Sequence, residues 1–467
     1  MTTIDALPGL EDVADLAGGS GEAVDRGGES SATRGGEPSP LRRGESSAPP
    51  RLRRPDRRQV TMEPCCLEER LPAGHPARTV WAVVERLDLS RFHEGILARG
   101  SSPGRAATDP RLLVALWLYA AIDGVGNGRE LDRLCREHDA YRWLCGGVTL
   151  NDHTLNDFRV GHESALDELL TQVLATLMHH QAVQVRRLSQ DGLRVRGSAG
   201  SSSFHREATL RRHLEAARSH VLALKHQAEE SPGASARQCA ARQRAARERQ
   251  ERLEAALAEL PKIAAAKAAQ KAKPSKERPP RASSTDPEVR VMKMGDGGFR
   301  PAHNVQLATD PVSRAIVGVA VCNAGSDARE SEPMRRQVER RTGARVEEHL
   351  MDGGFVALKG ITAAAASGVT VYAPPPVPRK GGNPYVARKG DSVAVAAWRQ
   401  RMGTPQAKAV YKLRAATSET VNADLRAHRG LDRVHVRGSA KVRSVILWLV
   451  LGYNLMHFAG VWLSAGT

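Results

Sequence analysis

The segment most informative about the fold is Ser189-Gln190-Asp191-Gly192-Leu193-Arg194-Val195-Arg196. It follows residues 183–188, whose composition is typical of a short β-strand. A second acidic residue, Asp352, directly follows a similar run at residues 346–351 and precedes Gly353-Gly354-Phe355. If both runs are neighbouring strands of one sheet, we expect Asp191 and Asp352 to meet where those strands end.

A third carboxylate, Glu419, lies in a stretch with helical character, in the pattern Tyr411-x2-Arg414-x4-Glu419-x6-Arg426. At about 100° per residue, Glu419, Asn422 and Arg426 fall within a stripe roughly 60° wide. One helix face would then offer a carboxylate and a cation to the same phosphate. An ordinary amphipathic surface helix with mixed charges explains the same pattern, and both interpretations stay open at this point.

Three converging carboxylates suit the binding of divalent metal ions. Carboxylate is the hard oxygen ligand that Mg²⁺ requires, and such a set can hold two ions roughly 3.5–4 Å apart. One ion then activates a water molecule and the other stabilises the leaving oxygen. The chain has 52 acidic residues, so no single one identifies a site, and Asp296 and Asp310 remain rival ligands.

Four further segments accompany these carboxylates, in order along the chain: Thr108-Asp109-Pro110-Arg111-Leu112-Leu113-Val114-Ala115-Leu116-Trp117, Asp152-His153-Thr154-Leu155-Asn156-Asp157-Phe158-Arg159, Met294-Gly295-Asp296-Gly297-Gly298-Phe299-Arg300-Pro301 and Val436-Arg437-Gly438-Ser439-Ala440-Lys441-Val442. Together they resemble bacterial insertion-sequence transposases of the DDE class, which have a ribonuclease H-like catalytic domain. The resemblance extends from about Leu67 to about His457. It implies that the first Asp lies on the first strand of the sheet, the second just after the fourth, and the Glu on a later helix. One departure is Arg426, where many relatives carry Lys; this keeps the charge but alters its geometry.

The resemblance implies an enzyme that binds the ends of an insertion sequence and performs Mg²⁺-dependent strand cleavage and strand transfer. Its partners are double-stranded DNA, as element ends and as target, and further copies of itself in a homo-oligomer. Two alternatives stay open: a DNA-end-binding remnant or repressor without catalysis, and a related nuclease without strand transfer. The implied catalytic and metal ligands, for two Mg²⁺ ions with Mn²⁺ as a substitute, are Asp191, Asp352 and Glu419, and the implied phosphate-positioning residues are Tyr411, Arg414, Asn422 and Arg426.

Composition along the chain divides it into three parts. Residues 1–61 have the acidic, then Gly/Ser/Pro-rich, then basic composition of a disordered tail. Residues 62–180 carry helical patterns and predict a helical DNA-binding domain. For residues 181–467 the resemblance implies a ribonuclease H-like catalytic domain, and their composition predicts a charged helical insertion that interrupts it at 205–285. The fold class we expect is therefore mixed α/β, with a mixed sheet flanked by helices.

Two helical segments have open roles. Residues 151–159 combine polar caps with side chains able to reach base edges, so they predict a recognition-type helix, although many packing helices begin in the same way. The insertion predicts a long charged hairpin, which would grip DNA, mediate dimerisation, or be a solvated hairpin without a specific role.

Charge and cysteine usage indicate the compartment and the partner. A formal net charge of +17 and a pI near 10.0 favour binding to a polyanion, although arginine enrichment in a GC-rich genome contributes to the excess. Six cysteines without metal-binding spacing suit a reducing cytoplasm, where we expect the protein at the nucleoid. The longest apolar run, residues 445–458, is too short to cross a bilayer and predicts a core helix, so we expect no membrane partner.

Overall fold

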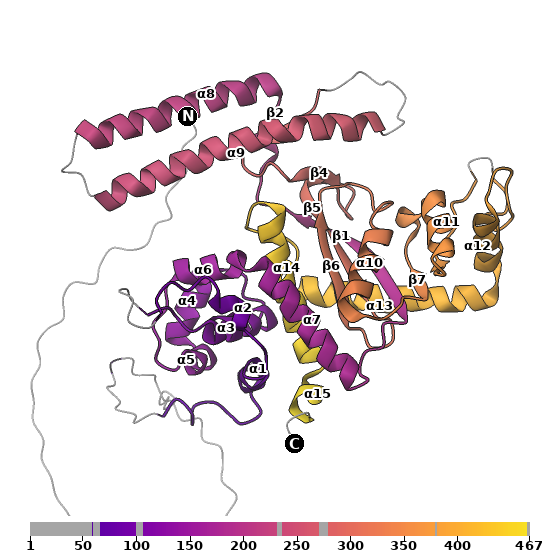
Figure 1. Cartoon of the computed structure of the whole chain (residues 1–467), viewed down its shortest axis with the longest axis horizontal. Coiled ribbons are helices and arrows are strands. Elements are labelled where there is room, and N and C mark those ends of the chain that lie inside the picture. The colour runs from indigo at the N-terminus through magenta and orange to yellow at the C-terminus, as the bar shows by residue number, and fades with distance from the viewer. Residues whose placement is uncertain are drawn as a thin grey trace, which may run out of the picture. The chain divides into compact units, whose positions relative to one another are not determined.

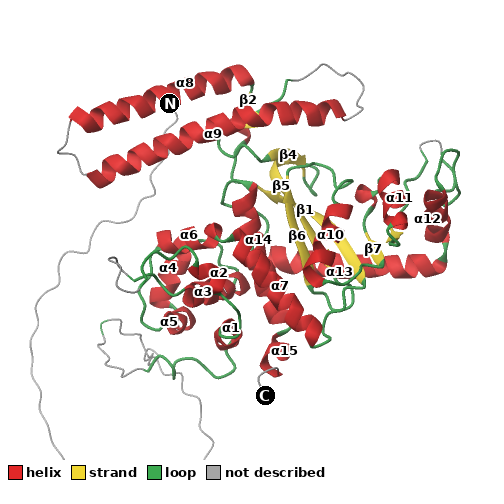
Figure 2. Ribbon diagram, viewed as in Figure 1, coloured by secondary structure: helices red, strands yellow, loops and turns green. Residues whose placement is uncertain are grey.

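The computed structural model describes residue 58 and residues 66–99, 106–230, 236–269, 279–378 and 381–464. The tail predicted for residues 1–61 lies outside these ranges, apart from Arg58. Figure 2 shows the secondary structure of the described residues, with many helices and one main sheet. The predicted mixed α/β class is confirmed.

The described residues before the sheet form seven helices, and polar caps fix where several of them begin. The Asp109 side chain accepts a hydrogen bond from the Arg111 N–H, and Pro110 occupies the first helical position, where its missing N–H costs nothing. The Asn151 side chain accepts from the Thr154 N–H in the same way. The helices are α1 (Pro76–Val84), α2 (Ser90–His93), α3 (Pro110–Ile122), α4 (Gly128–Glu137), α5 (Asp139–Cys145), α6 (Asp152–Gly161) and α7 (Glu163–His179).

The main sheet is mixed and has β1 (Arg187–Arg196) near its centre. β1 pairs antiparallel with β5 and parallel with β7, so both neighbours of the strand that carries Asp191 come from later in the chain. β5 also pairs antiparallel with β4 and β6, and β7 pairs parallel with β8. This order is consistent with the ribonuclease H-like sheet that the sequence resemblance implies. The remaining strands are β4 (Arg290–Lys293), β5 (Phe299–Thr309), β6 (Ile316–Cys322), β7 (Glu348–Leu350) and β8 (Thr370–Tyr372).

Helices flank this sheet, and two of them matter for the site. Helix α13 lies against β1, and α10 lies against β6 (Figure 1). The helix after β7 is preceded by a short 3-10 turn, Gly353–Phe355, which begins immediately after Asp352. The helices are α10 (Ser331–Thr342), α11 (Leu358–Ala366), α12 (Val393–Gly403), α13 (Pro405–Ala427), α14 (Ser439–His457) and α15 (Ala459–Ser464).

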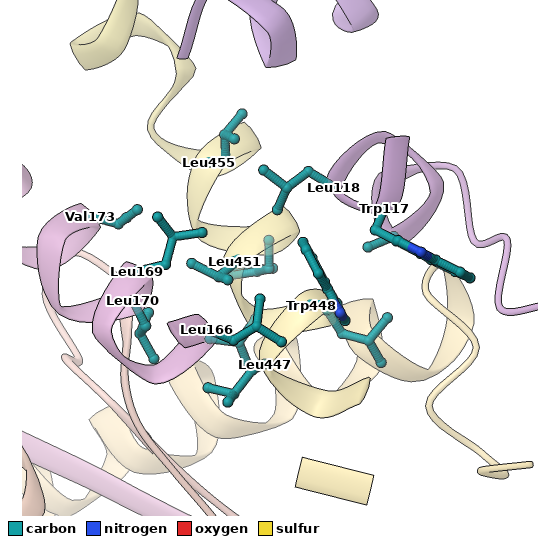
Figure 3. Close-up of a cluster of buried hydrophobic side chains, with 14 of the residues drawn as sticks. Trp117, Leu118, Leu166, Leu169, Leu170, Val173, Leu447, Trp448, Leu451 and Leu455 are labelled. Carbon is teal, nitrogen blue, oxygen red and sulfur yellow. The ribbon is translucent and has the colours of Figure 1, made fainter. Parts of the chain in front are cut away.

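Helix α14 joins the N-terminal helices to the sheet in one hydrophobic core. It packs against α3, α6 and α7 on one side and β6 on the other. Trp448 lies among leucines from these elements (Figure 3), and its indole N–H donates to the Arg159 carbonyl. The buried Asn454 side chain bonds to both the N–H and the C=O of Ile316 on β6. The apolar run at residues 445–458 is therefore a core helix, as predicted.

No helix in the described ranges has both the length and the apolar character needed to span a membrane. This agrees with the interpretation of α14, which is largely buried in protein. Its apolar surface is covered by α3, α7 and β6.

The insertion after β1 forms the predicted helical hairpin. Helices α8 (Glu207–Glu230) and α9 (Ala236–Ala269) pack against each other beside the end of the sheet that carries β4 (Figure 1). The base of the hairpin is closed by β2 (Phe204–His205) and β3 (Ala282–Ser283), which pair antiparallel. A separate small core holds the two helices together; it contains Leu210, Leu214, Ala217, Leu253, Ala256, Leu260, Ile263 and Ala282.

Candidate active site

The side chain of Asp191 points from the sheet towards helix α13. Alternate residues of a strand face opposite sides of the sheet, so Ser189 and Asp191 share one face. The Ser189 hydroxyl lies 2.9 Å from the Ser418 hydroxyl of α13. Asp191 Oδ2 accepts a hydrogen bond from Asn422 Nδ2 at 2.8 Å, and Asp191 Oδ1 accepts one from Arg414 Nη2 at 3.1 Å. Three side chains of one helix therefore hold this strand face.

Asp191 differs from its predicted position in one respect. The sequence placed it after a strand at residues 183–188, whereas β1 begins at Arg187 and continues to Arg196, with Asp191 inside it. The earlier run cannot extend into the sheet because Val185 has a φ of 51°, a turn conformation that interrupts a strand. Val183 and Val185 are instead buried in the main core.

Asp352 lies where β7 ends, as predicted, and its carboxylate is partly held by its own loop. Its Oδ1 accepts from the Gly354 N–H at 2.8 Å, which caps the short 3-10 turn. Its Oδ2 lies 4.0 Å from Arg414 Nη2. β7 is the parallel neighbour of β1, with Leu350 opposite Ser189, so Asp191 and Asp352 come from adjacent strands. Arg414 thus lies between two carboxylates.

The two carboxylates create an excess of negative charge that one guanidinium only partly offsets. Burial raises the pKa of Asp191, and the nearby Asp352 raises it further, while Arg414 and the Gly192 N–H act in the opposite direction. Burial also raises the pKa of Tyr411, which lies on α13 beside Arg414. Arg414 Nε is itself buried and has no hydrogen-bond partner within the described part of the chain.

Glu419 and Arg426 do not join this cluster. Both are exposed on α13, and the described residues contain no group of three or more His, Cys, Asp or Glu side chains placed to hold a metal ion together. The reason is the rotation of the helix: Ser418, Val421 and Leu425 are buried and set its inner face. Glu419 is about 100° around the helix from Ser418. The structure therefore brings together Asp191, Asp352, Arg414 and Asn422, but not the third carboxylate.

The donor set fits a divalent cation in part. Two carboxylates converge from adjacent strands, and the raised pKa of Asp191 reflects a position where a further positive charge would be favourable. Both are hard oxygen donors of the type that Mg²⁺ prefers. A third carboxylate would come from Glu419 only if α13 turned about its axis or the side chain reached around it.

Asp296 and Asp310, the two rival metal ligands, lie in turns, where their carboxylate oxygens accept hydrogen bonds from nearby residues of the same turn. Asp296 is exposed between β4 and β5, where it accepts from the Gly298 N–H and pairs with Arg300. Asp310 follows β5 and accepts hydrogen bonds from the Val312 and Ser313 N–H groups. The segment around Asp296 is a turn, with Gly297 at a φ of 81°.

A polar network on the opposite face of β1 was not predicted. Asp327 accepts hydrogen bonds from Arg194, from Asn304 Nδ2 at 2.7 Å and from Gln306 Nε2 at 2.6 Å. A Cβ at Gly192 would lie 2.5 Å from Asp327 Oδ1, so the network requires glycine next to Asp191. The feature of the sequence that could have indicated this network is the set of polar residues within β1 and β5. A sheet face that packs only against an apolar core would lack such residues.

Helix α6, predicted as a recognition-type helix, uses part of its motif for packing. Leu155, Phe158 and Arg159 are buried, and the Arg159 guanidinium stacks on Trp117 and donates to the Gly126 carbonyl. The exposed residues His153, Asn156 and Asp157 form its solvent-facing surface.

Two family models match this chain. Residues 65–160 match a transposase domain, DUF772, and residues 384–459 match a transposase DDE domain. The second match contains α12, α13 and α14, and therefore Arg414, Glu419 and Asn422. No curated protein and no solved structure shows a match to this chain. The two matches support assignment of the chain to the insertion-sequence DDE transposases, which confirms the resemblance noted in the sequence.

Proposed function

We propose that this transposase binds the ends of its insertion sequence, cleaves there in a Mg²⁺-dependent reaction, and joins the freed 3′-hydroxyl to target DNA. The observation that carries the proposal is the convergence of Asp191 and Asp352 on Arg414, from adjacent strands and the helix against them. Carboxylates that share one guanidinium can exchange it for metal ions, and the guanidinium can then bind a phosphate.

Each residue of the site has a separate role in the proposed reaction. Asp191 and Asp352 would hold divalent ions, which would supply activation of a water molecule and stabilisation of the leaving oxygen. Asn422 fixes the orientation of the Asp191 carboxylate through its 2.8 Å hydrogen bond. Arg414, with Tyr411 beside it, contacts the phosphate once it is released from the carboxylates. Glu419 completes the ligand set in the DNA-bound state, and Arg426 follows it on the same helix.

The partners and the place of action follow from this proposal. Double-stranded DNA is bound as element ends and as target, and a homo-oligomer brings two ends together. Mn²⁺ substitutes for Mg²⁺ because both accept oxygen ligands. The exposed face of α6 and the helical insertion supply DNA contacts from residues 62–180 and 205–285, and the reaction takes place at the nucleoid in the cytoplasm.

One observation favours a second candidate. Glu419 is exposed and apart from the two aspartates. A protein that occupies the element ends without cutting them needs no third ligand. This candidate is a DNA-end-binding remnant that acts as a repressor.

The test uses labelled DNA that carries the sequences flanking the gene, incubated with wild-type protein and with D191A, D352A and E419A. The proposal expects Mg²⁺-dependent cutting at the element boundary by wild type and its loss in all three variants, with DNA binding retained. If wild type binds the ends and does not cut them, the repressor is the better account. If E419A cuts as wild type does, the three-carboxylate site is wrong.

A further inference from the structure

A pocket of about 300 Å³ lies where the helical insertion meets the segment before α14, away from the aspartates. Arg249 and Arg252 reach it from α9 and Arg437 from the segment that leads into α14. His213 of α8 and the residues that follow β3 complete it. The full lining is His213, Arg249, Arg252, Leu253, Ser284, Thr285 and Arg437.

The charge in this pocket is poorly compensated by protein groups. Within the described residues, neither Arg249 nor Arg437 forms an ion pair with a carboxylate. The acidic contact of Arg252 is Glu248, at 3.7 Å from its Nη1, and Glu248 is largely exposed, so solvent weakens that attraction. Arg252 Nε is buried and has no hydrogen-bond partner among the residues that the structure describes. Burial lowers the pKa of Arg252, and Arg437 lowers it further. The pocket therefore favours an anion.

Hydrogen bonds join the segment that follows β3 to the start of α14 and to the sheet. Asp286, which follows the lining residues 284 and 285, is fully buried, and its Oδ1 accepts from the Gly438 N–H at 3.3 Å. Its Oδ2 lies 3.3 Å from Nε2 of the equally buried His303 on β5. The Ser439 N–H donates to Glu288. These bonds hold the segment of Arg437 against residues 286–288, and Arg290, which follows them, pairs with Glu259 of α9. The two sides of the pocket are therefore joined before any ligand arrives, which lowers the ordering cost of binding.

We propose that Arg249, Arg252 and Arg437 hold a backbone phosphate of the DNA on which the protein acts. This inference rests on the proposed function, since it names a second contact to the same DNA. Guanidinium groups match phosphate geometry and bind it in a bidentate way, and the Thr285 hydroxyl in the lining is a further donor of the kind that phosphate accepts. The Ser284 hydroxyl donates to the Ser203 carbonyl at 3.3 Å and fixes the lining beside it.

The location of the pocket places this contact at a distance from the reacting phosphate. Arg196, at the far end of β1, bonds to residues 432 and 434, three to five positions before Arg437. Arg196 is five positions after Asp191 on β1, which corresponds to about 17 Å at roughly 3.3 Å per residue. At roughly 3.4 Å per base pair, that length of strand corresponds to about five base pairs, so we place the phosphate held in the pocket several base pairs from the cleavage point.

The experiment compares R249Q/R252Q with R244Q/R247Q on the full chain. Both variants remove two exposed or partly exposed arginines with the same spacing from α9. Arg244 and Arg247 lie about 140° around the helix from Arg249 and Arg252, respectively. Binding of labelled end DNA is measured by fluorescence anisotropy without divalent metal, from 50 to 200 mM salt. R437Q, on a separate element, is the second variant.

The proposal expects R249Q/R252Q to bind roughly tenfold more weakly than R244Q/R247Q at low salt, with a salt slope lower by about 0.9, the value for one phosphate contact. R437Q should shift in the same direction. Equal affinities and slopes for the two double variants would overturn the proposal. Stabilisation of wild type by inorganic phosphate that R249Q/R252Q loses, with unchanged DNA binding, would also overturn it, since the ligand would then be a free anion.

This outcome is separable from a failure of the proposed function. If wild-type protein cuts element ends and both double variants bind DNA equally, the phosphate-binding role of the pocket is refuted and the transposase function is retained. If wild-type protein does not cut, and R249Q/R252Q is the only double variant that binds DNA more weakly, the catalytic proposal is refuted and the phosphate-binding role of the pocket is retained.

Discussion

Replacement of Arg414 by Gln should tighten the binding of divalent metal while it slows DNA cleavage. Arg414 Nη2 lies 3.1 Å from Asp191 and 4.0 Å from Asp352, so an incoming metal ion must displace or share this cation. Gln keeps a hydrogen-bond donor on the helix but removes the charge. The two carboxylates would then face each other without a guanidinium between them.

The size of the effect follows from these distances. At an effective dielectric constant of about 20, unit charges at 3.1 and 4.0 Å attract each other by about 5 and 4 kcal/mol. Asp352 is 41 % exposed, and solvent reduces these values to about 1–2 kcal/mol in total. Because about 1.4 kcal/mol is tenfold in affinity, R414Q should bind metal roughly tenfold more tightly.

The assay is isothermal titration with Ca²⁺, which fills oxygen sites, at pH 8 and without DNA. K412Q is the matched control, because Lys412 is an exposed cation on the same helix. K412Q should bind metal as wild type does. Metal affinity in R414Q that equals or falls below that of wild type would refute the view that Arg414 occupies the position of a metal ion.

Three further predictions concern the surroundings of the site. D191N should raise the thermal midpoint at pH 7 in differential scanning fluorimetry, because the pKa of Asp191 is raised in the folded protein and ionisation of this carboxyl therefore costs stability as pH rises through that pKa. The gain in midpoint should vanish below about pH 4, where the carboxyl is protonated in both states, and a gain independent of pH would contradict this cause. G192A should destabilise the protein by roughly 1–3 kcal/mol in urea unfolding, since the new methyl group would lie 2.5 Å from Asp327 Oδ1 and 2.7 Å from Gln306 Nε2. G295A is the control, because a methyl group there has nothing within 4 Å, and an equal loss of stability in both variants would refute the steric argument. N454L should cost roughly 2–5 kcal/mol in the same assay, because it leaves the buried N–H and C=O of Ile316 unpaired, and an unchanged unfolding midpoint would show that this contact does not join α14 to the sheet.

The meeting of Asp191 and Asp352 could be predicted because it depends on strand pairing. Each residue lies on or directly after a strand, and the two strands are parallel neighbours. The core role of α14 could also be predicted, since an apolar run that is too short to cross a bilayer is typical of a helix buried in protein. The start of β1 was not, because the turn at Val185 depends on packing rather than on β-propensity.

The position of Glu419 could not be predicted from helical periodicity alone. Periodicity places Glu419, Asn422 and Arg426 in one stripe, but it does not say which part of the stripe faces the sheet. Packing decides that: Leu425 and Val421 are fully buried, and Ser418 contacts Ser189. Asn422 at the edge of the stripe therefore reaches Asp191, whereas Glu419 faces solvent.

The Asp327 network depends on residues far apart in the sequence. Its members come from β1, β5 and the segment before α10, and no short motif links them. Only the pairing of β1 with β5 brings Arg194 opposite Asn304.

The most direct test of the central claim is strand transfer. Precut element ends with free 3′-hydroxyl groups are incubated with a target plasmid and Mg²⁺, using wild-type protein and D352N, and the joined products are quantified. We predict joined products with wild type that require Mg²⁺ and are absent with D352N. Joined products in D352N, or a wild-type protein that cuts element ends but never joins them, would contradict the account.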